Sequence, residues 1–286
     1  MTPFELAEPR TLREAVALLA TGEAPVRAIA GGTALMLMMK AGVFQPARLV
    51  SLRRVEAHHA AIAATPQGGL RIGAMATLSS LVHSAAVKQA APVITQTLKT
   101  LSNVRVRNVA TLGGHLAHGD PHMDLPPVLV ALGAQVRTLS PAGERTLALG
   151  ELYSGYYETV LADNELITEV IVPPQSAWHA AYMKVTTRAA DDWPTLGIAV
   201  SLRMESNMVQ DARIVVSAAT NTPVRLTAAE NTLRGASLDR ATLARCGEAA
   251  MSGTELAADA HGSSAYKREL LRVYTQRALR QIGDAL

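Results

Sequence analysis

The 286-residue sequence predicts an α+β fold, and three observations lead to this class. The chain is longer than one hydrophobic core usually serves, so two or three domains or subdomains are expected. Stretches with helical periodicity and stretches that resemble β-hairpins follow one another without the regular order of a doubly wound parallel sheet. The C-terminal part reads as three sheet strands followed by three helices, which is also an α+β order.

The N-terminal half is expected to alternate short helices and strands. Thr11 and Glu14 have the spacing of a capping box at the start of a helix. The turn "TPQGG" indicates a hairpin within residues 60–76, and Thr77 is expected to cap the helix that follows. We expect further helices at 34–42, 91–101 and 126–134, strands at 25–30 and 47–52, and a second hairpin at 135–149. Arg105 and Arg107 are expected on the solvated side of a short extended segment.

A double proline after residue 172 indicates a domain boundary. We expect a first domain over residues 1–175, with subdomains at about 1–55 and 56–175, and a C-terminal domain over 178–284. In the C-terminal domain, strands are expected at 179–188, 195–205 and 208–220, and helices at 224–234, 239–251 and 264–281.

The composition excludes several classes of protein. Hydrophobic residues make up 49% and charged residues 18% of the chain, which is an ordinary globular balance. The net charge is +3, with basic and acidic residues interleaved, so no nucleic-acid partner is expected. No apolar run approaches the roughly 20 residues that span a bilayer.

The chain has one cysteine, Cys246. One cysteine excludes a disulfide within the chain, a zinc site built on cysteines and an iron–sulfur cluster held by this chain alone. It fits a reducing compartment, and the N-terminal residues lack the pattern of a signal peptide, so a cytoplasmic protein is expected.

Two glycine loops are the strongest candidates for a binding site. "AIAGGTALM" and "ATLGGHLAH" each have an apolar lead-in, two glycines and a nearby polar residue. Glycine permits positive φ and a close approach of the backbone, and successive N–H groups in such a turn bind anions. Neither loop matches the Rossmann or P-loop pattern. Two such loops favour a dinucleotide with a pyrophosphate, which needs donors from more than one side.

The stretch "ATLGGHLAHGDPHMDLPPVL" also raises the possibility of a metal site. His115, His118, Asp120, His122 and Asp124 are residue types that bind zinc or iron. The stretch reads as an irregular loop, however, in which close spacing does not make side chains converge. Asp124 is also a plausible N-cap for the helix that begins at the prolines. No metal site is therefore predicted.

The long pattern T-x-G-G-x-L-x-x-x-D-P-x-x-D-x-P, together with "AGGTAL", resembles the flavin-binding medium subunit of the xanthine dehydrogenase family of molybdenum hydroxylases, which includes bacterial carbon monoxide dehydrogenase. The resemblance extends to "DARIVVSAATNTPVRLTAAENTLRG" and so covers nearly the whole chain. It implies a two-subdomain FAD-binding fold of the vanillyl-alcohol-oxidase (PCMH-like) type, followed by a smaller α+β domain of sheet and helices.

The resemblance also implies which residues bind FAD, non-covalently and with no catalytic residue in this chain. The first pyrophosphate loop is Ala30, Gly31, Gly32, Thr33 and Ala34, and the second is Thr111, Leu112, Gly113, Gly114 and His115. Asp124 matches an acidic residue that bonds the ribityl and ribose hydroxyls. Ile167, Lys184, Trp193 and Leu101 match positions beside the flavin or the adenine.

Three residues depart from the family pattern. His115 replaces the usual Asn or Ser, and Ala34 replaces a commonly polar residue. Trp193 is larger than the usual aromatic residue over the flavin, a change that bears on access to the flavin and on the choice of electron acceptor.

The resemblance implies electron transfer within a complex. A large subunit would hold molybdopterin, a small subunit would hold two 2Fe-2S clusters, and the complex would be a dimer of heterotrimers. The cysteine-rich 4Fe-4S insertion of one branch is absent from this sequence. Two alternatives remain open, a self-sufficient FAD-dependent oxidase of a small alcohol and a flavinless binding or scaffold module. Substrate and terminal acceptor do not follow from this chain.

Overall fold

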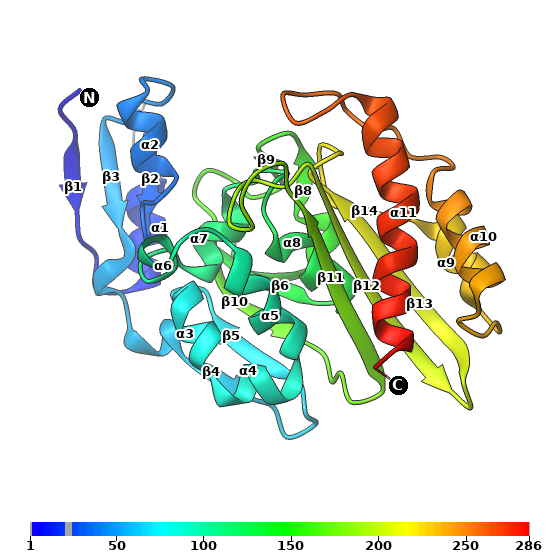
Figure 1. Ribbon diagram of the computed structural model, residues 1–286. Coiled ribbons are helices and arrows are strands. Elements are labelled where there is room, and N and C mark those ends of the chain that lie inside the picture. The colour runs from blue at the N-terminus through cyan, green and yellow to red at the C-terminus, as the bar shows by residue number, and fades with distance from the viewer. Residues whose placement is uncertain (1, 21–24, 286) are drawn as a thin grey trace.

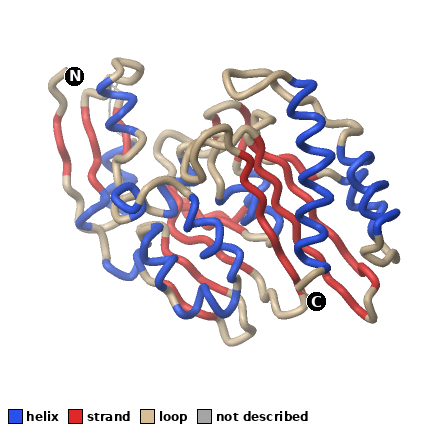
Figure 2. The backbone as a smooth tube through the Cα atoms, in the orientation of Figure 1, coloured by secondary structure: helices blue, strands red, loops and turns tan. Residues whose placement is uncertain are grey.

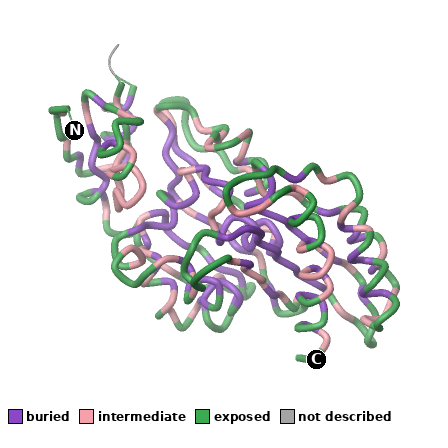
Figure 3. Tube along the Cα trace, turned by 45° about the horizontal axis from the view of Figure 1, so that its top comes forward, coloured by how far each residue is buried: buried purple, intermediate pink, exposed green. Residues whose placement is uncertain are grey.

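The computed structural model describes residues 2–20 and 25–285. These residues form a mixed helix and strand structure in which three larger sheets form separate groups (Figures 1 and 2). The predicted α+β class is confirmed. Figure 3 shows buried segments concentrated in the middle of the molecule, between the groups of elements.

The N-terminal subdomain contains a small parallel sheet. Its elements are β1 (Glu5–Ala7), α1 (Leu12–Leu19), β2 (Val26–Ile29), α2 (Leu35–Lys40) and β3 (Arg48–Ser51), and the strand order is β1-β3-β2. Both strand pairs are parallel, and the chain passes through α1 between β1 and β2 and through α2 between β2 and β3. Leu139 and Leu166 of the next subdomain complete the core of this unit.

The second subdomain is built on a five-stranded antiparallel sheet. Its strands are β4 (Ile62–Ala64), β5 (Leu70–Gly73), β6 (Gln135–Ser140), β7 (Gly143–Ala148) and β10 (Leu166–Val172), in the order β4-β5-β10-β6-β7. Its helices are α3 (Leu78–His83), α4 (Ala85–Ala90), α5 (Pro92–Thr100), α6 (Val104–Arg107), α7 (Leu112–Ala117) and α8 (Leu125–Ala131). A small pair, β8 (Tyr153–Gly155) and β9 (Glu158–Thr159), and 3-10 turns at Leu52–Arg54, Ala57–Ala60 and Leu149–Glu151 complete the first 175 residues.

The C-terminal part is a four-stranded antiparallel sheet with helices. Its elements are β11 (Trp178–Val185), β12 (Leu196–Glu205), β13 (Met208–Ser217), β14 (Val224–Arg225), α9 (Thr227–Leu233), α10 (Arg240–Ala250) and α11 (Ser264–Gly283). Helix α11 crosses β11 and β12 in Figure 1. Ala199 and Val215 of the sheet belong to the core shared with α8, whereas Ile198 and Val200 belong to the core with α9 to α11. The sheet is therefore covered on both faces, one of them by the preceding domain.

Local signals placed most elements correctly. Thr11 Oγ1 accepts a hydrogen bond from Glu14 N (3.1 Å) and Thr77 Oγ1 accepts one from Ser80 N (3.1 Å), as predicted from the capping signals. The Glu14 carboxylate accepts a hydrogen bond from the backbone N–H of Arg10 (2.8 Å). In a capping box it would accept from the N-cap residue, Thr11, which is the next residue.

Two segments differ from the prediction. The extended segment expected around Arg105 and Arg107 is the one-turn helix α6, because Asn103 Oδ1 accepts from Val106 N (3.1 Å) and caps it. Residues 112–117, read as an irregular loop, form helix α7, which Thr111 caps through Gly114 N (3.2 Å). Helix α4 and the short strands β1, β8 and β9 were not predicted, and Val224–Arg225, expected as the start of a helix at 224–234, form strand β14.

Candidate functional site

The first glycine loop joins β2 to α2 and keeps its backbone donors free. Within the described residues, the backbone N–H groups of residues 31–35 have no protein acceptor. Gly32 has φ +71°, a conformation that side chains with a Cβ rarely adopt, so the turn that presents these donors depends on glycine. Ala30, Thr33 and Ala34 are half-buried, and Ala34 stands at the N-cap of α2 without a side-chain bond. The loop fits an anionic group such as a pyrophosphate.

The second glycine loop uses its backbone donors internally. Leu112 N donates to Ala76 O (2.9 Å), and Gly113 N donates to Ala74 O (2.8 Å). The N–H groups of residues 114 and 115 both bond Thr111, at the hydroxyl and the carbonyl respectively. The expected nest of free N–H groups is therefore found in the first loop and not in the second.

The two glycines of the second loop have different surroundings. Gly113 is buried, and a Cβ at this position would lie 2.6 Å from the Cβ of Ala74. Gly114 is exposed, and its Cβ would meet Thr111 Oγ1 at 3.0 Å and Ala30 Cβ at 3.7 Å. Gly113 allows close packing within the second subdomain, whereas Gly114 faces the first loop.

The structure brings the two loops together across the subdomain boundary. A Cβ on Gly31 would lie 2.3 Å from the carbonyl oxygen of Val109 and 2.8 Å from Ala110 Cα, so only glycine permits this approach. The segment that leads into the second loop thus lies directly against the first loop. A single site that uses both loops, as predicted from the sequence, requires such a contact.

Asp124 connects the first domain to the C-terminal sheet. Its Oδ1 accepts a hydrogen bond from Tyr182 Oη (2.6 Å), and its Oδ2 accepts one from Lys184 Nζ (3.0 Å). Lys184 Nζ also donates to Thr100 O (2.9 Å) at the end of α5. Asp124 is 3% exposed. It precedes α8 but makes no side-chain cap bond, so its predicted role as an N-cap is wrong, because its carboxylate turns toward β11.

Burial dominates the protonation behaviour of this junction. Burial raises the pKa of Asp124 above its ordinary value, and the ammonium of Lys184 opposes that shift. Burial, and then the nearby Asp124 carboxylate, raise the pKa of Tyr182 well above its ordinary value. We take the carboxylate as ionised, because two donors converge on it.

Tyr182 was missed by the sequence reading. It is two residues before Lys184 on β11, and residues two apart on a strand share a face. That periodicity, applied to Lys184, would have identified it.

His115 is buried in α7 and has one unpaired ring nitrogen. Its Nε2 is buried and has no hydrogen-bond partner among the described residues. Burial, and to a smaller extent the neighbouring His118, lower the pKa of His115 to about 3. The imidazole is therefore neutral near pH 7.

The remaining predicted site residues divide between core and surface. Leu101 and Ile167 are each 6% exposed and belong to the main core of the first domain, as does the fully buried Leu112. Trp193 is 54% exposed, in the segment between β11 and β12.

The histidines and aspartates of residues 115–124 diverge. His122 Nδ1 lies 3.0 Å from Asp120 Oδ1, Asp124 bonds Lys184, and His115 lies inside α7. Across the described chain, no group of three or more His, Cys, Asp or Glu is arranged to hold a metal ion. Three of these residues, Asp120, His122 and Asp124, make hydrogen bonds within the protein.

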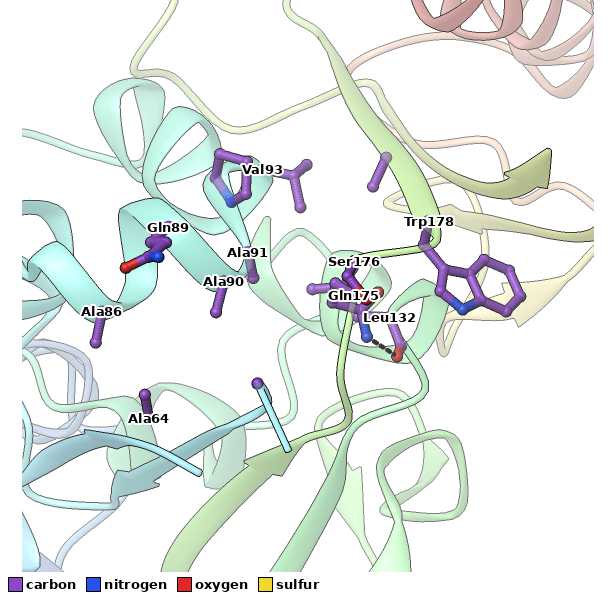
Figure 4. A pocket seen from close by; sticks show the side chains of 13 residues that line it. Ala64, Ala86, Gln89, Ala90, Ala91, Val93, Leu132, Gln175, Ser176 and Trp178 are labelled. Atoms are coloured by element: carbon purple, nitrogen blue, oxygen red, sulfur yellow. Dashed lines mark hydrogen bonds between the residues drawn. The ribbon is translucent and has the colours of Figure 1, made fainter. Parts of the chain in front are cut away.

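A cavity of about 480 Å³ lies elsewhere, between α4, α5 and the segment that leads into β11 (Figure 4). Gln175 Nε2 donates to Leu132 O (3.1 Å) at its wall, and Trp178 borders it. The predicted site residues do not line it in the described structure.

Family models match both parts of the chain. Residues 2–175 match the FAD binding domain in molybdopterin dehydrogenase, and residues 180–282 match the CO dehydrogenase flavoprotein C-terminal domain. None of the helices in the described residues is long and apolar enough to cross a membrane.

Individual relatives agree over nearly their full length. The chain is 31% identical to the carbon monoxide dehydrogenase medium chain of Hydrogenophaga pseudoflava, over 96% of each chain. It is also 31% identical to the nicotine 6-hydroxylase medium subunit of Paenarthrobacter nicotinovorans, over 97% of this chain and 96% of that protein. Among solved structures, it is similar to a chain of carbon monoxide dehydrogenase from Hydrogenophaga pseudoflava (TM-score 0.94, 32% identity, 99% of each chain). A chain of quinoline 2-oxidoreductase from Pseudomonas putida 86 gives a TM-score of 0.93 at 29% identity, over 99% of this chain and 98% of that one.

Proposed function

The chain belongs to the family of FAD-binding medium subunits of molybdenum hydroxylases, and we propose from this premise that it transfers electrons between a partner subunit and an external acceptor. It is an oxidoreductase subunit whose cofactor is FAD. In the proposed path, electrons arrive from 2Fe-2S clusters of a small subunit, which takes them from a molybdopterin centre on a large subunit. The single cysteine of this chain agrees with clusters held elsewhere.

The observation that supports the site most directly is the row of free N–H groups at residues 31–35. We propose that these groups bind the FAD pyrophosphate, and that the second loop adds the exposed face of Gly114 beside Ala30. Bound FAD supplies the redox chemistry, and the protein supplies its position and electrostatic surroundings.

The other site residues are proposed to have distinct roles in binding FAD. Asp124 and Lys184 are joined by an ion pair. We propose that both face the polar parts of FAD, through the lone pairs of the carboxylate and the ammonium hydrogen that the protein does not use. His115 Nε2 has no partner within the described residues, and we propose that it forms a hydrogen bond with the cofactor. Ile167, Leu101 and Leu112 are proposed to support the site from the core, and Trp193 to lie at its edge.

The domain organisation follows the same premise. We propose a FAD-binding domain over residues 1–175, with subdomains that meet at the glycine loops, and a C-terminal domain over 178–284. The whole complex is proposed to be a dimer of heterotrimers in the cytoplasm. The lone, buried Cys246 suits a reducing compartment.

Two measurements test the proposal. The purified chain should contain about one FAD per polypeptide, and acid precipitation should release the flavin to the supernatant, because the binding is non-covalent. Flavin that stays with the precipitate would contradict the non-covalent site, and colourless protein that does not take up added FAD would contradict the cofactor assignment.

Co-purification from the native host tests the partners. A large molybdenum-containing and a small iron–sulfur polypeptide should accompany this chain. A fully active dehydrogenase composed of this polypeptide alone would support instead a self-sufficient oxidase.

A further inference from the structure

The segment between β11 and β12 is exposed, yet one of its side chains is stacked against the first domain. Residues 187–193 are exposed, and the indole of Trp193 lies over the imidazole of His122. The ring centroids are 5.4 Å apart and the planes differ by 16°, which is a stacked arrangement. A large aromatic side chain on an exposed segment is thereby held at a defined place.

His122 is itself fixed from two directions. Its backbone N–H and its Nδ1 both bond Asp120 Oδ1, at 2.9 and 3.0 Å. Its Nε2 lies 3.6 Å from Asp259 Oδ2, which accepts a hydrogen bond from the buried Lys267 Nζ at 2.6 Å. Asp120 holds one edge of the ring by hydrogen bonds and Asp259 lies near the other edge, so one face of the ring is available for Trp193.

The stack lies next to the proposed flavin site. His122 is two residues before Asp124, and the segment with Trp193 follows the strand that contains Lys184. The ion pair of Asp124 and Lys184 (3.0 Å) joins these two segments. His122 occupies a variable position of the long family pattern, so the pattern by itself gives it no role.

We propose that His122 is a positioning residue that holds the Trp193 indole beside the flavin, where the indole limits the approach of electron acceptors. This inference rests on the proposed function, because it requires FAD at the site. The stack fixes the indole, and loss of the stack leaves Trp193 attached only to an exposed segment. Small acceptors would then reach the flavin more easily.

The first experiment measures the stack without any cofactor. The chain has two tryptophans, so in a Trp178→Phe background Trp193 is the sole tryptophan. Its emission maximum and its quenching by acrylamide are compared in that background, in His122→Ala and in His261→Ala. His261 contacts His122 at 5.7 Å and a 52° tilt, so it is a matched control from the same cluster. His122→Ala should lower the docked fraction of the indole by roughly two- to tenfold, seen as stronger quenching and a red-shifted emission, and His261→Ala should not.

The second experiment measures access to the flavin. The FAD-loaded chain is reduced with one equivalent of dithionite and mixed with dioxygen, and flavin absorbance is followed in a stopped-flow instrument. Each reduced FAD gives two electrons and two protons to dioxygen, which forms hydrogen peroxide. Trp193→Ala and His122→Ala should both speed reoxidation by roughly two- to tenfold, while His261→Ala keeps the original rate. His122→Gln, which keeps a donor for Asp120 but has no ring, replaces the alanine variant if that variant aggregates.

The two experiments test the positioning role of His122 and the control of access to the flavin separately. Unchanged quenching in His122→Ala, or faster reoxidation in Trp193→Ala alone, would overturn the positioning role. Unchanged reoxidation in both variants would overturn the control of access. A wild-type chain that binds no FAD would overturn the proposed function and the control of access with it, whereas the fluorescence comparison would still decide whether His122 holds Trp193.

Discussion

The two glycine loops have similar sequences, but among the described residues the backbone N–H groups are free in the first loop and hydrogen-bonded within the protein in the second. In the first loop, the N–H groups of residues 31–35 have no protein acceptor in the described chain. In the second, residues 112–115 donate to Ala74, Ala76 and Thr111. The polar groups that follow are also satisfied, since Asp124 accepts from Tyr182 and Lys184. A Gly-Gly pair therefore does not by itself indicate anion donors, because a helix cap and a neighbouring segment can bond them all.

The largest effect on stability is expected at Asp124, which follows the second glycine loop and has two hydrogen-bond donors. Asp124→Ala should lower the free energy of unfolding by about 3–5 kcal/mol, because it leaves the buried ammonium of Lys184 without its anionic partner. Urea unfolding of the cofactor-free chain measures this. Asp163→Ala, at a side chain that is 99% exposed, is the control. A stable Asp124→Ala protein that fails only to bind FAD would assign the carboxylate to the cofactor and not to the domain junction.

Gly113→Val should have the next largest effect, on stability. Its Cβ would lie 2.6 Å from Ala74 Cβ, so the variant should lose about 3 kcal/mol and bind less FAD only because less protein is folded. Gly150→Ala is the matched control, since its Cβ meets nothing closer than Val130 at 3.7 Å. Thermal unfolding gives the result. An unchanged melting temperature would mean that the second loop is less closely packed than its contacts indicate.

His115 predicts a dependence of stability on pH. The unfolded chain binds a proton near pH 6.5, whereas the folded chain binds it only near a pKa of about 3, because of burial. The folded state therefore loses stability as the pH falls below 6.5, by about 2 kcal/mol at pH 5. His115→Asn should remove this part of the dependence, and the exposed His83→Asn should keep it. Equal slopes of unfolding free energy between pH 6.5 and 5 in the wild type and in His115→Asn would refute the prediction.

Gly114→Val should give the smallest change in free energy, and this change should affect FAD binding and not folding. Gly114 is exposed beside Ala30, so a larger side chain should hinder FAD while the fold is kept. We expect FAD binding about tenfold weaker, equal to about 1.4 kcal/mol, with no loss of melting temperature. Titration of the cofactor-free chain with FAD, followed by flavin fluorescence, measures it. Normal affinity would place the cofactor away from the second loop and leave the first loop as the pyrophosphate site.

The sequence by itself determined most local structure. Caps at Thr11 and Thr77, turns at the hairpins and the periodicity of the C-terminal strands are local signals, and the corresponding elements are found in the structure. The exceptions were also local in origin: Asn103 and Thr111 cap helices as short as one or two turns, whose periodicity is too brief to recognise. The long motif pattern identified the family and its cofactor.

Only the tertiary structure decided which polar groups remain free. Asp124 looked like a helix cap, but Tyr182 and Lys184, about 60 residues further along the chain, take its carboxylate because burial makes an unpaired charge costly. Gly31 and Gly113 are required by contacts with Val109 and Ala74, which no sequence spacing records. The same holds for His122 and Trp193, whose stacking depends on the packing of the C-terminal sheet against the first domain. Whether a hydrogen-bond donor or an aromatic face is occupied depends on residues far away in the sequence, and these residues come into contact only when the chain is folded.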